Sequence, residues 1–189
     1  ALALGAAALL GTAASVLMPT YANTAVAHAE ESCSLANAYQ ITKGHQDLAV
    51  RDDNGPLRFT VDDDSSGSHV EREEGEFVVI VDDAMTRSLD DLGFPGISGN
   101  AWLLPQNQEY SRPWFGFSLL HLSTMTDSDT AQLTMELNSA PAGGRIVAWK
   151  DELTGHQLLL DSDDPGMAWD YYRSHTHVNL GFTEPGAYA

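Results

Sequence analysis

Short apolar or alternating segments, separated by turn signals, run from about residue 39 to the end of this sequence, and no segment has the pattern of a long helix. Phe77–Val81 is rich in β-branched residues, which is typical of a buried strand. Ala131–Leu137 alternates apolar and polar side chains, as a half-buried strand does. About ten such strands predict an all-β fold, an antiparallel β-sandwich of immunoglobulin-like or jelly-roll-like type.

The first 29 residues contain no Lys, Arg, Asp or Glu and begin with an apolar run, Ala1–Met18. They end in Ala27–Ala29, a small-x-small pattern that is typical of a signal-peptide cleavage site. The run could also span a membrane, but the glycines and the proline that interrupt or follow it favour a signal peptide. We therefore expect a signal peptide over residues 1–29 and a single secreted or cell-surface β-sandwich domain over residues 30–189, with its last strand cut short.

The expected mature part carries every formal charge, 9 Lys and Arg against 27 Asp and Glu, for a net charge of −18. Such a surface repels nucleic-acid phosphates and anionic membranes and raises the local concentration of cations. We expect no nucleic-acid partner and no membrane insertion of the mature chain. Cys33 is the single cysteine, so no disulfide can form within this sequence.

His175 and His177 stand in a segment, His175–Phe182, that lacks helix formers and predicts a strand. Side chains two apart on a strand share one face, about 6.5–7 Å apart, so the two imidazoles could bind one metal ion. The alternative is an exposed polar face. Zinc usually takes three or four ligands, so a site needs a partner elsewhere in the chain. Glu184–Gly186 predicts a turn, after which Tyr188 would begin a strand that pairs back as a hairpin.

A series of short motifs follows one another in the order and spacing of a known family. They are Gly44–Leu48, Gly55–Asp63, Leu104–Gln108, Trp114–Gly116, Gly144–Val147, Leu160–Ser162, His175–His177 and Phe182–Tyr188. From about Tyr39 to the end, the chain resembles the choice-of-anchor M domain of actinobacterial surface-anchored repeat proteins. Leu180 departs from the pattern, because the family has Trp there.

The resemblance implies a secreted or wall-anchored module, often associated with ABC transporters similar to those that import zinc or manganese. We further expect that the protein is not an enzyme, because the catalytic motifs named below are absent. The resemblance also brings in a third histidine motif, Gly44–Asp47. We therefore predict that His45, His175 and His177 bind a divalent metal, most readily zinc, with Asp47 as fourth ligand or as a hydrogen-bond acceptor behind a ligand. The expected partners are an ABC-type metal uptake system or other cell-surface components. Since protons compete for imidazole, affinity is expected to fall as the pH drops through about 6.5.

Other functions have weaker sequence support. No nucleophile elbow, phosphate loop or His-Glu-x-x-His helix is present, although a three-histidine zinc site could activate water. The rival binding function is a surface adhesion or glycan-binding module with structural histidines, in which Trp169–Tyr172 would be an exposed aromatic patch. Asp161–Gly166 lacks the spacing of a calcium-binding EF-hand loop, and Asp62–Asp64 predicts a solvated charge run at the start of an acidic loop, Asp62–Glu76. The remaining candidates are His121, which could face the same site but is favoured as a hydrogen-bonded or exposed strand histidine, and two histidines predicted to be solvated, His69 and His156.

Overall fold

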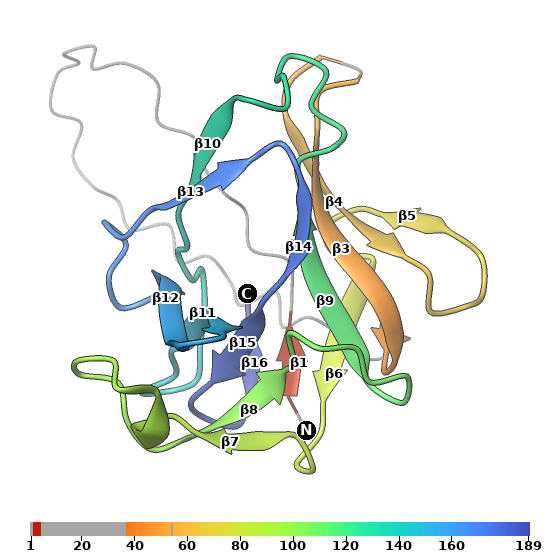
Figure 1. The fold of residues 1–189 in the computed structure, drawn as a ribbon. Coiled ribbons are helices and arrows are strands. Elements are labelled where there is room, and N and C mark those ends of the chain that lie inside the picture. Colours follow the sequence, from red (N-terminus) through yellow and green to blue (C-terminus); the bar gives the residue numbers. More distant parts are fainter. Residues whose placement is uncertain (1, 5–36, 54) are drawn as a thin grey trace, which may run out of the picture.

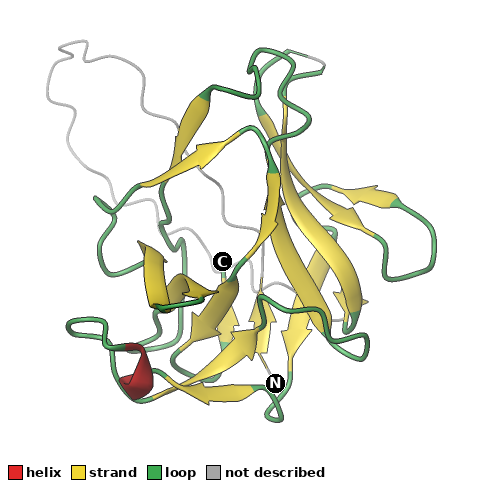
Figure 2. Cartoon of the chain, in the orientation of Figure 1, coloured by secondary structure: helices red, strands yellow, loops and turns green. Residues whose placement is uncertain are grey.

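Strands dominate the computed structural model, which describes residues 2–4, 37–53 and 55–189 (Figures 1 and 2). The strands are β1 (Leu2–Leu4), β2 (Tyr39–Ile41), β3 (Gly44–Arg51), β4 (Arg58–Asp63), β5 (Val70–Arg72), β6 (Phe77–Val81), β7 (Thr86–Ser88), β8 (Asn100–Leu104), β9 (Pro113–Ser118), β10 (Thr130–Leu133), β11 (Ile146–Glu152), β12 (Gly155–Asp161), β13 (Trp169–Tyr172), β14 (His175–His177), β15 (Asn179–Phe182) and β16 (Ala187–Tyr188). In this part of the chain the helical structure is a 3-10 turn, η1 (Asp90–Leu92), and no helix is long and apolar enough to cross a membrane. The predicted all-β sandwich class is confirmed. There are more strands than predicted, because those of two or three residues are too short to show an alternation.

Two five-stranded sheets form the body of the molecule. Sheet I has the order β14-β9-β3-β4-β5, and sheet II has the order β12-β11-β15-β8-β7. A four-stranded sheet, β16-β1-β6-β2, and a two-stranded pair, β10-β13, complete the described part. The largest apolar cluster takes buried side chains from both five-stranded sheets, among them Val61 and Phe115 of sheet I and Ile146 and Phe182 of sheet II. The core therefore lies between the sheets, and the outer face of sheet I is free for polar residues.

The pairing of the strands is not purely antiparallel. Strands β1 and β16, β2 and β6, and β3 and β9 run parallel. A parallel pair needs a long crossover connection, which short-range turn signals do not reveal. The pairing of β3 with β9 is the one that matters for function, because it sets His45 opposite Trp114 and Asp47 opposite Gly116.

The segment predicted as one strand from His175 to Phe182 is two strands in different sheets. Strand β14 pairs with β9 in sheet I, and β15 pairs with β8 and β11 in sheet II. Figure 1 shows β14 alongside β9 and continuing into β15 near β8 and β11. The predicted hairpin is wrong, since β16 pairs with β1. The turn before β16 is instead closed by the Tyr188 hydroxyl, which donates to the carbonyl of Glu184.

The acidic segment from Asp62 begins inside a strand, contrary to prediction. Asp62 and Asp63 belong to β4 and are buried, because each has a cationic partner from elsewhere in sheet I. Arg51 binds Asp62, and Arg72 donates to Asp63 at 2.7 Å. Burial alone would raise the pKa of Asp63, but hydrogen bonds from Ser65, Arg72 and Gln46 lower it below its usual value.

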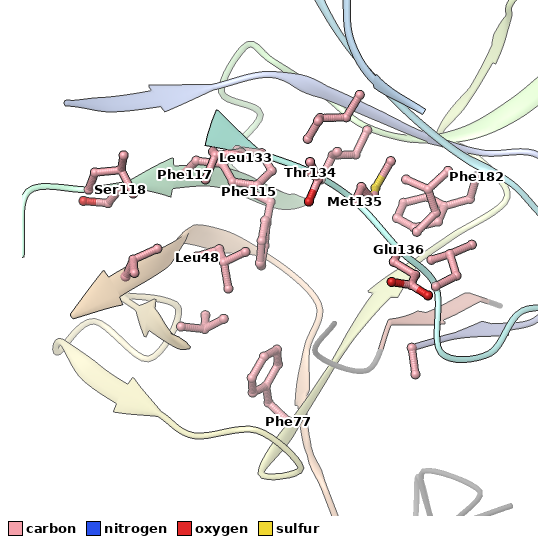
Figure 3. Close-up of a pocket in the computed structure, with 18 residues that line it drawn as sticks. Leu48, Phe77, Phe115, Phe117, Ser118, Leu133, Thr134, Met135, Glu136 and Phe182 are labelled. Carbon is pink, nitrogen blue, oxygen red and sulfur yellow. The ribbon is translucent and has the colours of Figure 1, made fainter. Parts of the chain in front are cut away.

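An apolar pocket of about 100 Å³ lies on the core side of sheet I (Figure 3). Leu48 of β3 and Phe115 and Phe117 of β9 line it. Because side chains alternate along a strand, the residues between them point to the other face. The neighbours Asp47 and Gly116 therefore lie on the outer face, and the pocket is separate from the histidines described next.

Most of the predicted signal peptide lies outside the described residues, as does Cys33. The described piece of it is Leu2–Leu4, which forms β1 between β6 and β16.

Candidate metal centre

Four side chains that are far apart in the sequence meet on the outer face of sheet I. His45 and Asp47 come from β3, and His175 and His177 come from β14. Each offers one ligand atom, and these atoms all lie within 4.8 Å of one another. We call these four residues the histidine cluster. Such a set of imidazoles and a carboxylate can hold one metal ion.

Strand β9 brings the two halves of the histidine cluster together. It lies between β3 and β14, and its Gly116 is the register partner of both Asp47 and His177. Residues two apart on a strand share a face, so His45 joins Asp47 and His175 joins His177. The His-x-Asp spacing on β3 and the His-x-His spacing on β14 therefore place all four side chains on the same face of the sheet, on the two sides of β9.

The distances within the cluster are short and involve the ring nitrogens that point inward. Nε2 of His177 lies 3.2 Å from Nε2 of His45 and 3.1 Å from Nε2 of His175. The Asp47 carboxylate lies 2.9 Å from Nε2 of His175 and 3.3 Å from Nε2 of His45. It lies 3.8 Å from Nε2 of His177. His177 is thus the central imidazole, in close contact with both others.

Gly116 provides the space in which the cluster converges. A Cβ atom at this position would lie 2.4 Å from Oδ1 of Asp47 and 2.9 Å from Cε1 of His177. Both distances are shorter than van der Waals contact, so any side chain here would push the carboxylate or the imidazole away. The glycine is needed because the Asp47 carboxylate and the His177 ring approach the backbone of β9 closely, and not because the backbone adopts an unusual φ angle.

Trp114 covers one side of the cluster. Its ring stacks on the ring of His177 with centroids 3.6 Å apart and planes only 9° from parallel. The indole is held in place because its Nε1 donates to the carbonyl oxygen of Gln106 at 2.9 Å. A fixed aromatic wall of this kind orients the central imidazole and shields it from water.

Burial shifts the pKa values of the two inner residues, His177 and Asp47, and the shift at His177 is the one that suits a metal site. Burial and, to a smaller extent, the neighbouring His175 and His45 together lower the pKa of His177 to about 4, while a backbone contact with Phe115 opposes the shift. No hydrogen bond satisfies the buried Nδ1 of His177 within the described residues. Burial also raises the pKa of Asp47 against the opposing charges of His45 and His175. His177 is therefore neutral, with a lone pair available for a metal, over the whole physiological range.

The low pKa of His177 predicts that acid destabilises the metal-free protein. The unfolded chain takes up a proton near the ordinary value of 6.5, whereas the folded chain does so only near 4. Between these values the unfolded state binds more protons, so the stability falls as the pH drops from 6.5 to 4. We expect the loss to be smaller in His177→Gln. Denaturant unfolding with a chelator present, from about pH 7 to about pH 4, measures this loss of stability in both proteins. Equal losses in the wild type and in His177→Gln would show that His177 is not its cause.

The other predicted histidine candidates lie outside the cluster. His121 contacts Asp62 at 3.1 Å, so it does not complete the site. His69 is exposed but pairs with Asp64 at 3.2 Å, and His156 pairs with Asp151 at 2.8 Å. The predictions of solvated side chains for His69 and His156 therefore missed a carboxylate partner for each.

The structure also bears on two further sequence candidates, the aromatic patch and the acidic turn Asp161–Gly166. Trp169–Tyr172 forms β13, in which Tyr171 is buried and Trp169 packs against the apolar clusters, leaving Tyr172 as the exposed ring. The expected aromatic patch is thus reduced to one side chain. In the acidic turn, Arg145 binds both carboxylate oxygens of Asp161, so this carboxylate is not free to bind calcium.

Trp114 and Gly116 belong to the site, although the sequence did not single them out as part of a metal centre. Both stand in one of the motifs that carry the family resemblance. Their place beside His45 and Asp47 follows from the pairing of β3 with β9, which the sequence does not reveal.

The chain matches no protein-family model, and comparisons with curated proteins and with solved structures find no significant match. Evidence for function therefore comes from the histidine cluster itself.

Proposed function

We propose that this protein is a secreted, cell-surface module that binds one zinc ion through His45, His175, His177 and Asp47 and takes part in metal uptake. The single observation that supports this most strongly is the convergence of the lone-pair atoms. Nε2 of His177 lies within hydrogen-bonding distance of two other Nε2 atoms, and one neutral imidazole nitrogen can donate to only one of them. An ionised Asp47 carboxylate can only accept hydrogen bonds, so it cannot donate one to any of the imidazoles. A divalent cation among the four groups would satisfy every lone pair at once.

The spacing of the donor atoms supports zinc. Zn–N and Zn–O bonds of about 2.0–2.1 Å in a tetrahedron place neighbouring ligand atoms about 3.3 Å apart. The five close contacts of the cluster range from 2.9 to 3.8 Å and so bracket this value. Calcium and magnesium prefer all-oxygen sites, and a set rich in imidazole suits zinc and the neighbouring late transition metals.

The number of donors supports binding over catalysis. Structural zinc sites are usually closed by four protein ligands, whereas catalytic sites keep one position open for water. Three imidazoles and one carboxylate would fill a tetrahedral zinc. We therefore propose that the protein is not an enzyme.

The position of the cluster supports exchange of the metal with a partner. Strand β14 is an edge strand of sheet I, and His175 is exposed there while His177 is buried. A metal held at such an edge is reachable by an acceptor. The excess of carboxylates, 27 against 9 basic residues, attracts cations towards it. Together with the resemblance to surface-anchored repeat proteins, this supports an ABC-type metal uptake system, or another cell-surface component, as partner.

Zinc titration of the purified metal-free protein tests the proposal. We expect one zinc per chain and a rise in melting temperature that grows with zinc concentration, since a ligand that binds only the folded state stabilises it. The rise should disappear in His175→Ala and persist in His156→Ala, whose imidazole pairs with Asp151 in sheet II. No binding in calorimetry, or an equal thermal shift in all three proteins, would refute a site made by the histidine cluster.

A further inference from the structure

The outer nitrogen of His45 faces a carboxylate that is not part of the histidine cluster. Nδ1 of His45 lies 3.0 Å from Oδ2 of Asp64, while Nε2 of the same ring points to His177 and Asp47. The two nitrogens therefore face two different surroundings. Nδ1 faces a carboxylate at the surface, and Nε2 faces the centre of the cluster.

Asp64 is fixed in this position from two sides. Its backbone N–H donates to the carbonyl oxygen of His45 at 3.0 Å, continuing the ladder between β3 and β4. Its second carboxylate oxygen, Oδ1, contacts Nδ1 of His69 at 3.2 Å. The backbone bond sets the distance to His45, and His69 keeps the carboxylate from turning away.

We infer that Asp64 is a positioning residue for the metal: it holds the proton of neutral His45 on Nδ1 and so presents the Nε2 lone pair to the ion. An ionised carboxylate can only accept hydrogen bonds, so this hydrogen bond requires a proton on Nδ1, and at 3.0 Å it is shorter than the 3.3 Å contact between Nε2 and the Asp47 carboxylate. A neutral imidazole carries only one proton, and Nε2 is then free for a metal. Contacts of this kind also make the imidazole a stronger ligand and fix its orientation.

The ionisation of Asp64 agrees with this arrangement. The hydrogen bond with His45 lowers the pKa of Asp64 below its usual value, and the hydrogen bond with His69 adds to the shift. The neighbouring Asp62 cannot take over, because it is bound by Arg51 and faces His121. Asp64 is thus the carboxylate of β4 and its following loop that serves His45.

The inference rests on the proposed metal site, and the first measurement separates the two. In the metal-free protein at about pH 8, where imidazoles are neutral, long-range ¹H–¹⁵N correlations report which nitrogen of His45 carries the proton. We expect Nδ1 in the wild type, both nitrogens in Asp64→Ala, and Nδ1 again in Asp64→Asn, whose side-chain oxygen still accepts. A wild-type proton on Nε2 overturns the inference whether or not zinc binds.

The second measurement is zinc affinity, by competition with a chromophoric chelator. We expect Asp64→Ala to weaken zinc binding about tenfold. This is the smallest loss usual for a residue that hydrogen-bonds a metal ligand, and we expect it because Asp64 is partly exposed. Asp64→Asn should weaken it less. Asp53→Ala, at the far end of the β3–β4 hairpin, is the matched control and should leave the affinity unchanged. An Asp64→Ala affinity within about twofold of the wild type would refute the inference, and a wild type without zinc affinity would refute the proposed function instead.

Discussion

Zinc binding should be lost when His177 is replaced by alanine, and this is the largest effect expected from any single substitution in the cluster. His177 is the central imidazole of the histidine cluster, with its Nε2 within 3.2 Å of the Nε2 atoms of the other two histidines. It is also the imidazole that burial helps to keep neutral, with a pKa of about 4. Mutation of residues that only hydrogen-bond a metal ligand already lowers metal affinity about 10–100-fold. We therefore expect the loss of the central imidazole to lower zinc affinity by more than about 100-fold. Isothermal titration calorimetry and chelator competition measure it.

The controls separate loss of the ligand from loss of the fold. Removing the ring leaves a space under Trp114, which stacks on it at 3.6 Å, so His177→Ala is expected to lower the stability as well. His177→Gln fills much of that space and should lose zinc equally while destabilising less. His121→Ala, whose ring contacts Asp62 outside the cluster, should keep the affinity. Zinc binding by His177→Gln within a few fold of the wild type would contradict the proposed ligand set.

The histidine pair shows how much of the site the sequence predicts. The His-x-His spacing on a strand predicts two imidazoles on one face, and the structure places His175 and His177 in that way. The addition of His45 and Asp47 came from the family resemblance and not from any local pattern. A local pattern could not predict it, because His45 and Asp47 meet the histidine pair only through the parallel pairing of β3 with β9. Short-range turn signals do not predict such a pairing.

The buried carboxylates show where local reasoning fails. Asp62 and Asp63 look like a solvated acidic run, because a buried carboxylate needs a partner that a short window does not contain. The partners, Arg51 and Arg72, come from the neighbouring strands β3 and β5. The passage of the chain from sheet I to sheet II after His177 cannot be predicted from a short window for a similar reason. An alternating pattern predicts a strand but does not specify which neighbour it pairs with.

Gly116→Ala is expected to disrupt the cluster without removing any donor group. The added Cβ would lie 2.4 Å from Oδ1 of Asp47, 2.9 Å from Cε1 of His177 and 2.9 Å from the carbonyl oxygen of Thr176. The carbonyl is part of β14, so relief requires either that the carboxylate turns away or that β14 separates from β9. Either change spreads the ligand atoms. We expect zinc affinity to fall by at least about tenfold and stability to fall by about 1–3 kcal/mol, the usual cost of overpacking.

A second glycine separates these two effects. At Gly181, in β15 of sheet II, a Cβ would lie 2.9 Å from the ring of Trp149 and 3.2 Å from Cβ of Ala101. Gly181→Ala should therefore cost a similar stability and leave zinc affinity intact. Gly166→Ala, whose nearest neighbour is 3.4 Å away, should change neither. If Gly116→Ala bound zinc as tightly as Gly181→Ala, the ion would not lie between Asp47 and His177. A selective loss in Gly116→Ala would place it there, because this glycine touches the ligands and supplies none.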